Sequence, residues 1–256
     1  MSSSTRSEFI EQFSTDLNAL GVSAGMTVMV HSSLSAFGQV PGGADTIIDA
    51  LRELLTSEGT LLMPALSYLT VTRRQPVFDL LNTPSCVGII PETFRQRQDV
   101  LRSLHPTHSV CGWGKHANDL LTEHALDHTP CGPHSPFHRL PKFDGFILML
   151  GCGLEPNTSL HAIEELVTPP YLFSEPITYT LIDENGSTSQ KEYTPHNFNG
   201  REQRYDRVAN LLSSPQLRSG EVAGAPCHLI HAPALWKAAL AQLRQNPLSF
   251  VETVRS

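Results

Sequence analysis

The sequence predicts one mixed α/β domain over residues 1–256, with a central sheet that is partly parallel. Short apolar runs typical of buried strands alternate along the chain with amphipathic segments of helical period. The first complete unit, over residues 26–63, has the order strand, helix, strand, which places its two strands parallel in one sheet. The length of 256 residues, 40% of them hydrophobic, is enough to bury one large core.

Two long amphipathic helices and the first buried strands are expected in the first half of the chain. Apolar side chains at helical spacing predict a helix over 7–20, and Gly21 is a residue that commonly ends one. Met26–Val30 is an apolar strand that leads into a polar turn, and Gly42-Gly43 opens the second helix. The further elements expected are a strand over 60–63, a loop over 64–85, a helix over 88–97, a strand over 109–113, a helix over 115–123 and a loop with a short helical piece over 124–142.

The second half begins with a strongly apolar strand, Phe146–Leu150, which ends in a glycine-rich turn. A helix over 157–167 follows. Glu184-Asn185-Gly186 then separates two strands, over 177–182 and 190–194, and is the clearest hairpin signal in the chain. The remaining elements expected are a helix near 202–213, a short strand near 227–231 and a helix over 233–245.

Composition excludes several classes of function. The net charge is −7 and no Lys/Arg cluster forms a stripe that could follow a phosphate backbone, so nucleic acid is not an expected partner. No apolar run reaches the roughly 18 residues that span a bilayer, so no membrane association is expected. The five cysteines form no CxxC pair, and the first residues lack a signal-peptide profile. These features predict free thiols and a cytoplasmic location.

The sequence contains one hydrolase motif, but without the order of secondary structure that the motif requires. Residues 21–25 match G-x-S-x-G, but the nucleophile elbow of a hydrolase needs a strand before the motif and a helix after it. Here a helix precedes and a strand follows, so we interpret Ser23 as part of an ordinary turn.

A histidine-rich stretch raises the question of a metal. Its members are His124, His128, Cys131, His134 and His138. Zinc needs three or four convergent ligands, and this stretch fits no standard spacing. No metal is therefore expected, and a histidine-rich metal-dependent hydrolase is the less favoured alternative.

His161 and Glu164 are the candidates for acid–base chemistry. They are three residues apart on the predicted helix 157–167 and therefore project from one face. A carboxylate that accepts a hydrogen bond from one imidazole nitrogen raises the basicity of the other, which is what a general base needs. Glu165 points about 100° away. From the spacing alone, an ion pair that merely supports the helix stays open.

Four segments carry a resemblance to a known family when they are taken together. They are His31–Gly38 with Gly42-Gly43-Ala44; Arg102–Val110, which contains His-Pro-Thr-His-Ser; Ser135-Pro136-Phe137; and Leu150–Gly153 with Asn157–Glu165. In their order and residue types they resemble the aminoglycoside N3-acetyltransferase family, also called the antibiotic N-acetyltransferase family. The resemblance extends from about Leu20 to Leu243.

The resemblance implies a fold of its own, distinct from the common GNAT acetyltransferase fold. It also implies acetyl-CoA as co-substrate, and transfer of the acetyl group to a small-molecule amine, typically the 3-amino group of an aminoglycoside. That activity would confer antibiotic resistance. Transfer to a different amine is the alternative, and a homodimer is left open. Residues 39–44 only loosely fit the pyrophosphate loop of the common superfamily.

The resemblance also assigns roles to individual residues. His161 and Glu164 are expected to be catalytic. The expected coenzyme contacts are His31, Ser32, Ser33, Leu34 and Ser35 at the end of the first strand, and His105, Pro106, Thr107, His108 and Ser109 in the second segment. Ligands of α/β proteins gather at such strand ends, although both segments also suit local turn chemistry.

One segment departs from the family pattern. Members that act on aminoglycosides often carry an acid in the loop after the second strand, where this chain has Pro64–Thr70 followed by Arg73-Arg74, and the nearest acid is Asp79. Unpaired positive charge repels a polycation. The departure predicts a narrower choice of acceptor.

Overall fold

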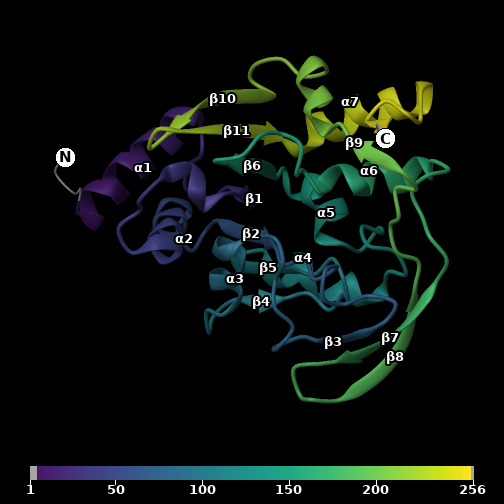
Figure 1. Ribbon diagram of the computed structural model, residues 1–256. Helices are drawn as coiled ribbons and strands as arrows, with labels where there is room; N and C mark the ends of the chain where they lie inside the picture. The colour runs from purple at the N-terminus through teal and green to yellow at the C-terminus, as the bar shows by residue number, and fades with distance from the viewer. Residues whose placement is uncertain (1–4, 255–256) are drawn as a thin grey trace.

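The computed structural model describes residues 5–254 and is built around a seven-stranded mixed sheet (Figure 1). Its strand order is β10-β11-β6-β1-β2-β5-β4. The three middle strands are parallel to one another, and the outer strands run antiparallel to their neighbours. The predicted, partly parallel α/β sheet is thereby confirmed. The strands are β1 (Thr27–Ser32), β2 (Thr60–Pro64), β4 (Leu101–Arg102), β5 (Val110–Gly114), β6 (Phe146–Leu150), β10 (Leu217–Val222) and β11 (Ala225–His231).

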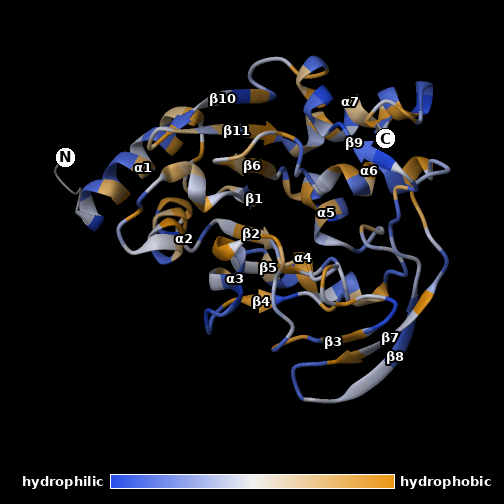
Figure 2. Ribbon diagram, viewed as in Figure 1, coloured by the Kyte–Doolittle hydropathy of each residue, from blue (hydrophilic) through white to orange (hydrophobic). Residues whose placement is uncertain are grey.

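Helices cover both faces of the sheet, because its middle strands are apolar on both sides (Figure 2). In β1, Val28 and Val30 face one core, whereas Met29 faces the other. The helices packed on the first core are α1 (Arg6–Leu20), α2 (Gly43–Leu55) and α3 (Ile89–Arg95). Those packed on the second are α4 (Ala117–Leu121), α5 (Pro136–Arg139), α6 (Ser159–Val167) and α7 (Ala232–Gln245).

Two smaller sheets lie beside the central one. The predicted hairpin is present as β7 (Ile177–Ile182) and β8 (Thr188–Tyr193), and it curves around the lower right of the molecule in Figure 1 to pair with β3 (Val77–Asp79). Far along the chain, β9 (Arg201–Gln203) pairs with β12 (Val251–Thr253). No helix within the described residues is both long and apolar enough to cross a bilayer.

The structure corrects several expected elements. The segment 64–85 is not all loop, because it contains β3. The helix expected near 202–213 is wrong: the chain forms β9 and then a short 3-10 helix, Tyr205–Asn210, since residues 201–203 pair with a strand near the end of the chain. The strands β4, β10 and β12 were not expected. His31 and Ser32 are not turn residues but the last two residues of β1, paired with Met149 and Leu150.

Candidate active site

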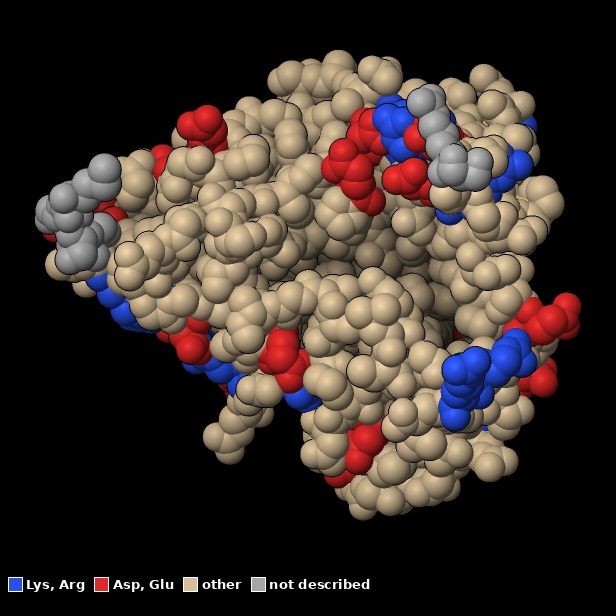
Figure 3. Space-filling view, viewed as in Figure 1, with Lys and Arg blue, Asp and Glu red and all other residues tan. Residues whose placement is uncertain are grey.

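A cavity opens where the carboxyl end of β1 meets α6 and the segment between β8 and the 3-10 helix. It encloses about 580 Å³ and continues into a narrower slot of about 80 Å³. The two spaces are continuous because they share four lining residues, Leu66, Val87, Pro156 and Thr158. The face drawn in Figure 3 is hollowed near its centre, between the elements that carry these residues, and most of the surface around the hollow is uncharged.

The start of α6 is fixed by the turn that follows β6. Gly151 has a φ of +68°, and a Cβ there would lie 2.7 Å from the Phe37 ring and 2.9 Å from the carbonyl oxygen of Ser33. Only glycine fits this close approach. Further along, the side-chain oxygen of Asn157 accepts a hydrogen bond from the backbone amide of Ser159. The turn and this hydrogen bond just before the N-cap residue, Thr158, hold the first turn of α6, and therefore His161, at the edge of the cavity.

His161 and Glu164 are joined by a hydrogen bond, as their spacing predicts. His161 Nδ1 lies 3.2 Å from Glu164 Oε2. Glu164 is fully buried, and its carboxylate also accepts hydrogen bonds from the hydroxyls of Tyr205 (2.6 Å) and Tyr171 (2.8 Å). These donors replace the water that a buried carboxylate lacks. The pair is therefore part of a buried network, and is not a surface ion pair that only supports the helix.

The network fixes which nitrogen of His161 is free. The Tyr205 hydroxyl donates to Glu164, so its oxygen, 2.6 Å from His161 Nδ1, accepts from that ring. Nδ1 consequently carries the proton, and Nε2 keeps its lone pair. The side chain of His161 is 11% exposed and lines the cavity. The arrangement supplies an oriented imidazole whose Nε2 atom, when unprotonated, can take a proton from a molecule in the cavity.

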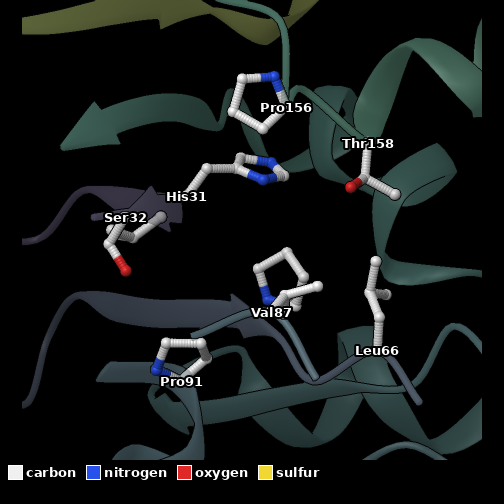
Figure 4. Close-up of a pocket in the computed structure, with 9 residues that line it drawn as sticks. His31, Ser32, Leu66, Val87, Pro91, Pro156 and Thr158 are labelled. Carbon is white, nitrogen blue, oxygen red and sulfur yellow. The ribbon is translucent and has the colours of Figure 1, made fainter. Parts of the chain in front are cut away.

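Residues 31–35, the first segment predicted to contact the coenzyme, lie partly in the slot lining and partly outside it. His31 and Ser32 line the slot, and the His31 ring points across it toward Thr158 (Figure 4). Burial, and then nearby His161, lower the pKa of His31 to about 3, and its Nε2 atom has no partner among the described residues. Leu34 packs against the core, and the Ser33 and Ser35 hydroxyls bond each other near the surface. From this segment the slot therefore receives the neutral imidazole of His31 and the side chain of Ser32.

The second predicted segment contributes only His108 to the cavity lining. His105 Nδ1 accepts hydrogen bonds from the backbone amides of Thr107 and His108, and its ring stacks on the buried His124. Ser109 Oγ donates to Ala65, and the carbonyl of Pro106 accepts from Ser67. Through these hydrogen bonds, the groups hold the backbone of the loop in place without lining the cavity themselves. Coenzyme contact by His105, Pro106, Thr107 and Ser109 stays a prediction, and their burial favours a supporting role.

Two further groups of the cavity were not expected from the sequence. Tyr205 lay in a predicted helix, and His196 lies in the segment between β8 and β9. His196 Nε2 is 2.8 Å from Glu165 Oε1, and the His196 ring packs 4.9 Å from the His161 ring. Burial, and then His161, hold the pKa of His196 well below its usual range. Burial also raises the pKa of Glu165 to about 7.

The histidine-rich stretch after α4 does not form a site. The two ring nitrogens of His124 bond Ser103 and the carbonyl of Pro130, His128 bonds the carbonyl of Glu192, and His134 bonds Asp127. The rings of His124, His128 and His134 are therefore bonded to their own neighbours. Among the described residues, the three groups close enough to share an ion are instead His108, His161 and His196.

The loop after β2 contributes Leu66 and Tyr68 to the cavity lining, but its basic residues, Arg73 and Arg74, are not among the lining residues. Arg73 donates to the carbonyl of Glu175, and Asp79 accepts hydrogen bonds from Leu81 and Asn82. The carboxylate that lines the cavity at its exposed side is Glu155. The argument that Arg73 and Arg74 repel a cationic acceptor therefore has no support in the geometry.

A buried, oriented imidazole that lines a cavity, with a narrow slot beside it, is an arrangement that can transfer a proton to or from a bound small molecule. Comparison with known proteins identifies the family. The model for aminoglycoside 3-N-acetyltransferases matches residues 29–244. The chain belongs to this family, and is thus an acyltransferase.

Individual relatives agree with that placement. The chain is 32% identical over 240 residues to the SPbeta prophage-derived aminoglycoside N(3')-acetyltransferase-like protein YokD of Bacillus subtilis, covering 86% of each sequence. It superposes on the YokD crystal structure with a TM-score of 0.81 at 31% identity, covering 96% of each chain.

The similar solved structures include complexes with a bound molecule. Aminoglycoside acetyltransferase AAC(3)-IVa, in complex with a gentamicin, has a TM-score of 0.81 at 29% identity, over 98% of this chain and 92% of that one. The AAC-IIIb binary complex with CoASH has a TM-score of 0.79 at 27% identity and 99% coverage of both chains.

Proposed function

We propose that this enzyme transfers the acetyl group of acetyl-CoA to an amine of an aminoglycoside, most directly the 3-amino group. The observation that carries the proposal is the buried His161–Glu164 pair, whose free imidazole nitrogen faces a cavity. Family membership and the gentamicin and CoASH complexes of relatives support the two substrates. The cavity volume of about 580 Å³ lies within the range of small-molecule sites.

The coenzyme's thioester end is proposed to enter through the slot. The slot is narrow, is lined mainly by apolar side chains and leads to His161 through the shared residue Thr158. An extended pantetheine arm suits such a passage, whereas the wider cavity suits the acceptor. His31 and Ser32 provide polar contacts along the arm.

The reaction then needs two protons removed from the acceptor and one C–S bond broken. The ammonium form of the acceptor first gives one proton to the solvent, and His161 Nε2 then takes a second proton from the neutral amine as it attacks the thioester carbon. The new C–N bond forms, the C–S bond breaks and the coenzyme leaves as its thiolate, which the His161 imidazolium then protonates. Glu164 stabilises that imidazolium, because it lies 3.2 Å from Nδ1.

Thr158 is proposed to hydrogen-bond the developing oxyanion. It lies at the junction of slot and cavity, where the thioester carbonyl must sit, and its hydroxyl points into the slot (Figure 4). A donor placed for that oxygen stabilises charge that develops only in the transition state.

The proposed reaction uses no metal, since His161 alone supplies the base. The five free cysteines favour a cytosolic location. Acetylation of a different small amine is the second candidate, because Glu155 is the one acid among the described residues that line the cavity and an aminoglycoside carries several positive charges.

The test is thiol release from acetyl-CoA by chelator-treated protein with a panel of amines. Gentamicin-type and kanamycin-type acceptors are compared with simple alkylamines and amino sugars, and each product is analysed by mass spectrometry for the added acetyl group. The proposal expects turnover of aminoglycosides at the 3-amino position without metal. Turnover of simple amines alone would favour the second candidate, and no turnover unless zinc is restored would favour a metal-dependent hydrolase.

A further inference from the structure

Three imidazoles converge on the cavity from three distant parts of the chain. His108 comes from the loop before β5, His161 from α6 and His196 from the segment after β8. One ring nitrogen of each lies within 4.8 Å of those of the other two. The proposed reaction needs only one of these rings as its base, so the close approach of the other two requires a separate explanation.

Each ring is held by a hydrogen bond on one nitrogen, and within residues 5–254 the other nitrogen has no hydrogen-bond partner. His108 Nδ1 bonds Thr107 Oγ1 at 2.9 Å, His161 Nδ1 bonds Glu164, and His196 Nε2 bonds Glu165 at 2.8 Å. The remaining nitrogen of His196, Nδ1, is buried and has no partner among the described residues, in a side chain that is 4% exposed. Histidines that ligate metals are held in this way, with the second nitrogen bonded to a carboxylate, carbonyl or hydroxyl.

The surroundings of the three rings suit a dication. Glu164 and Glu165 lie directly behind His161 and His196, so two carboxylates back the three imidazole ligands. All three rings line the cavity, which leaves a fourth coordination position open toward it. Tetrahedral zinc with Zn–N bonds of about 2.0–2.1 Å needs nitrogens about 3.3 Å apart, so the rings need to close by only about 1.5 Å.

We propose that His108, His161 and His196 form an inhibitory binding site for Zn²⁺ or a similar transition-metal dication. A metal bound there takes the lone pair of His161 Nε2, so that nitrogen can no longer accept a proton. The inhibitory half of the proposal rests on the proposed function of His161, whereas the binding half does not. The metal competes with catalysis and is not required for it.

The binding half is tested without substrate. Chelator-treated protein is titrated with Zn²⁺ by calorimetry and with Co²⁺ by visible absorption, where a tetrahedral site gives a strong d–d band. We expect one ion per chain and the tetrahedral band. The variant His196→Ala should abolish both, and Glu165→Gln, which keeps all three ligands, should weaken binding about 10- to 100-fold.

The control is His134→Ala, which removes a half-exposed histidine of the histidine-rich stretch and should leave the ion bound. Thermal unfolding of each variant verifies that it is folded, and His196→Asn serves if the alanine variant is not. A lack of stoichiometric binding, or binding that His196→Ala and His196→Asn leave unchanged, overturns the site.

The inhibitory half is tested by thiol release. We expect stoichiometric Zn²⁺ to abolish turnover by the wild-type enzyme and a chelator to restore it. Binding with full activity would overturn the inhibition while leaving the site. If the enzyme turns over no amine at all, the proposed function fails, but the Co²⁺ spectrum still decides whether the site exists.

Discussion

Replacing Glu164 by glutamine isolates the contribution of the buried carboxylate. The substitution keeps the shape of the side chain and one acceptor oxygen. It removes the negative charge and turns the second oxygen into an amide nitrogen, which cannot accept a hydrogen bond. In the structure, Oε1 accepts from Tyr171 and Oε2 accepts from Tyr205 and His161. Whichever way the amide is oriented, at least one of these donors loses its acceptor.

The expected magnitude follows from the hydrogen bond between Glu164 and the imidazolium that forms during the reaction. A hydrogen bond between charged groups contributes about 1.5–3 kcal/mol. Both partners of this hydrogen bond are charged only after proton transfer. The bond therefore stabilises the transition state more than the ground state. Loss of about 2–3 kcal/mol corresponds to a fall in kcat of roughly 30- to 150-fold.

The assay is thiol release at saturating acetyl-CoA, measured over a range of pH for the wild-type and Glu164→Gln enzymes. Glu58→Gln, which removes an exposed ion pair with Lys115, is the matched control and should behave as wild type. A Glu164→Gln enzyme that is folded and keeps kcat within about 3-fold over that pH range would refute the role of the carboxylate.

Three further predictions follow from the same geometry. Thr158→Val should lower kcat about 10²- to 10³-fold while Thr158→Ser keeps most of it, and equal loss in both would contradict an oxyanion role. Glu155→Gln should raise the KM for an aminoglycoside about 2- to 5-fold, and an unchanged KM would show that acids elsewhere hold the acceptor. The free energy of unfolding should fall between pH 7.5 and 5.5. His31 and His124, both with a pKa of about 3 through burial, stay neutral in the folded protein, while the unfolded chain takes up their protons below about pH 6.5. Each costs about 1.4 kcal/mol at pH 5.5. Glu165 offsets part of this, since its pKa of about 7 makes it take up a proton in the folded state over the same range. Denaturant unfolding at the two pH values measures the difference, and greater stability at pH 5.5 would contradict it.

The local sequence pattern was sufficient to predict those elements whose pairing partners are near in sequence or whose apolar runs are continuous. Phe146–Leu150 is strand β6, as predicted, and the hairpin around Asn185-Gly186 is present with β8 starting two residues earlier than expected. The His161–Glu164 contact could be predicted because both side chains lie on one helix face.

The rest of the site depends on contacts between distant segments. Tyr205 reaches His161 and Glu164 across more than 40 residues, and His196 reaches Glu165 across 31. The local spacing of apolar and polar residues carries no information about such contacts. The segment around Tyr205 was misassigned for the same reason, because β9 exists only through its pairing with β12. A tyrosine within a short polar segment was the only local signal.

His124 shows how burial decides which histidine can serve as a control in these experiments. In the sequence it belongs to a histidine-rich loop, but its ring is fully buried, bonded to Ser103 and stacked on His105. His124→Ala would open a cavity and is expected to reduce stability. His231, which is partly exposed and bonded only to Asp144 through its ring nitrogen, is the better control.

The measurement that tests the central claim most directly is kcat for His161→Ala together with the dissociation constant of the coenzyme. A general base acts on the amine and not on the nucleotide. The account therefore predicts a fall in kcat of about 10²- to 10⁴-fold with little change in acetyl-CoA binding, and no comparable loss in His231→Ala. Near-normal kcat in folded His161→Ala, with activity abolished by a change at His105 or His108, would contradict it and place the base on the His-Pro-Thr-His loop.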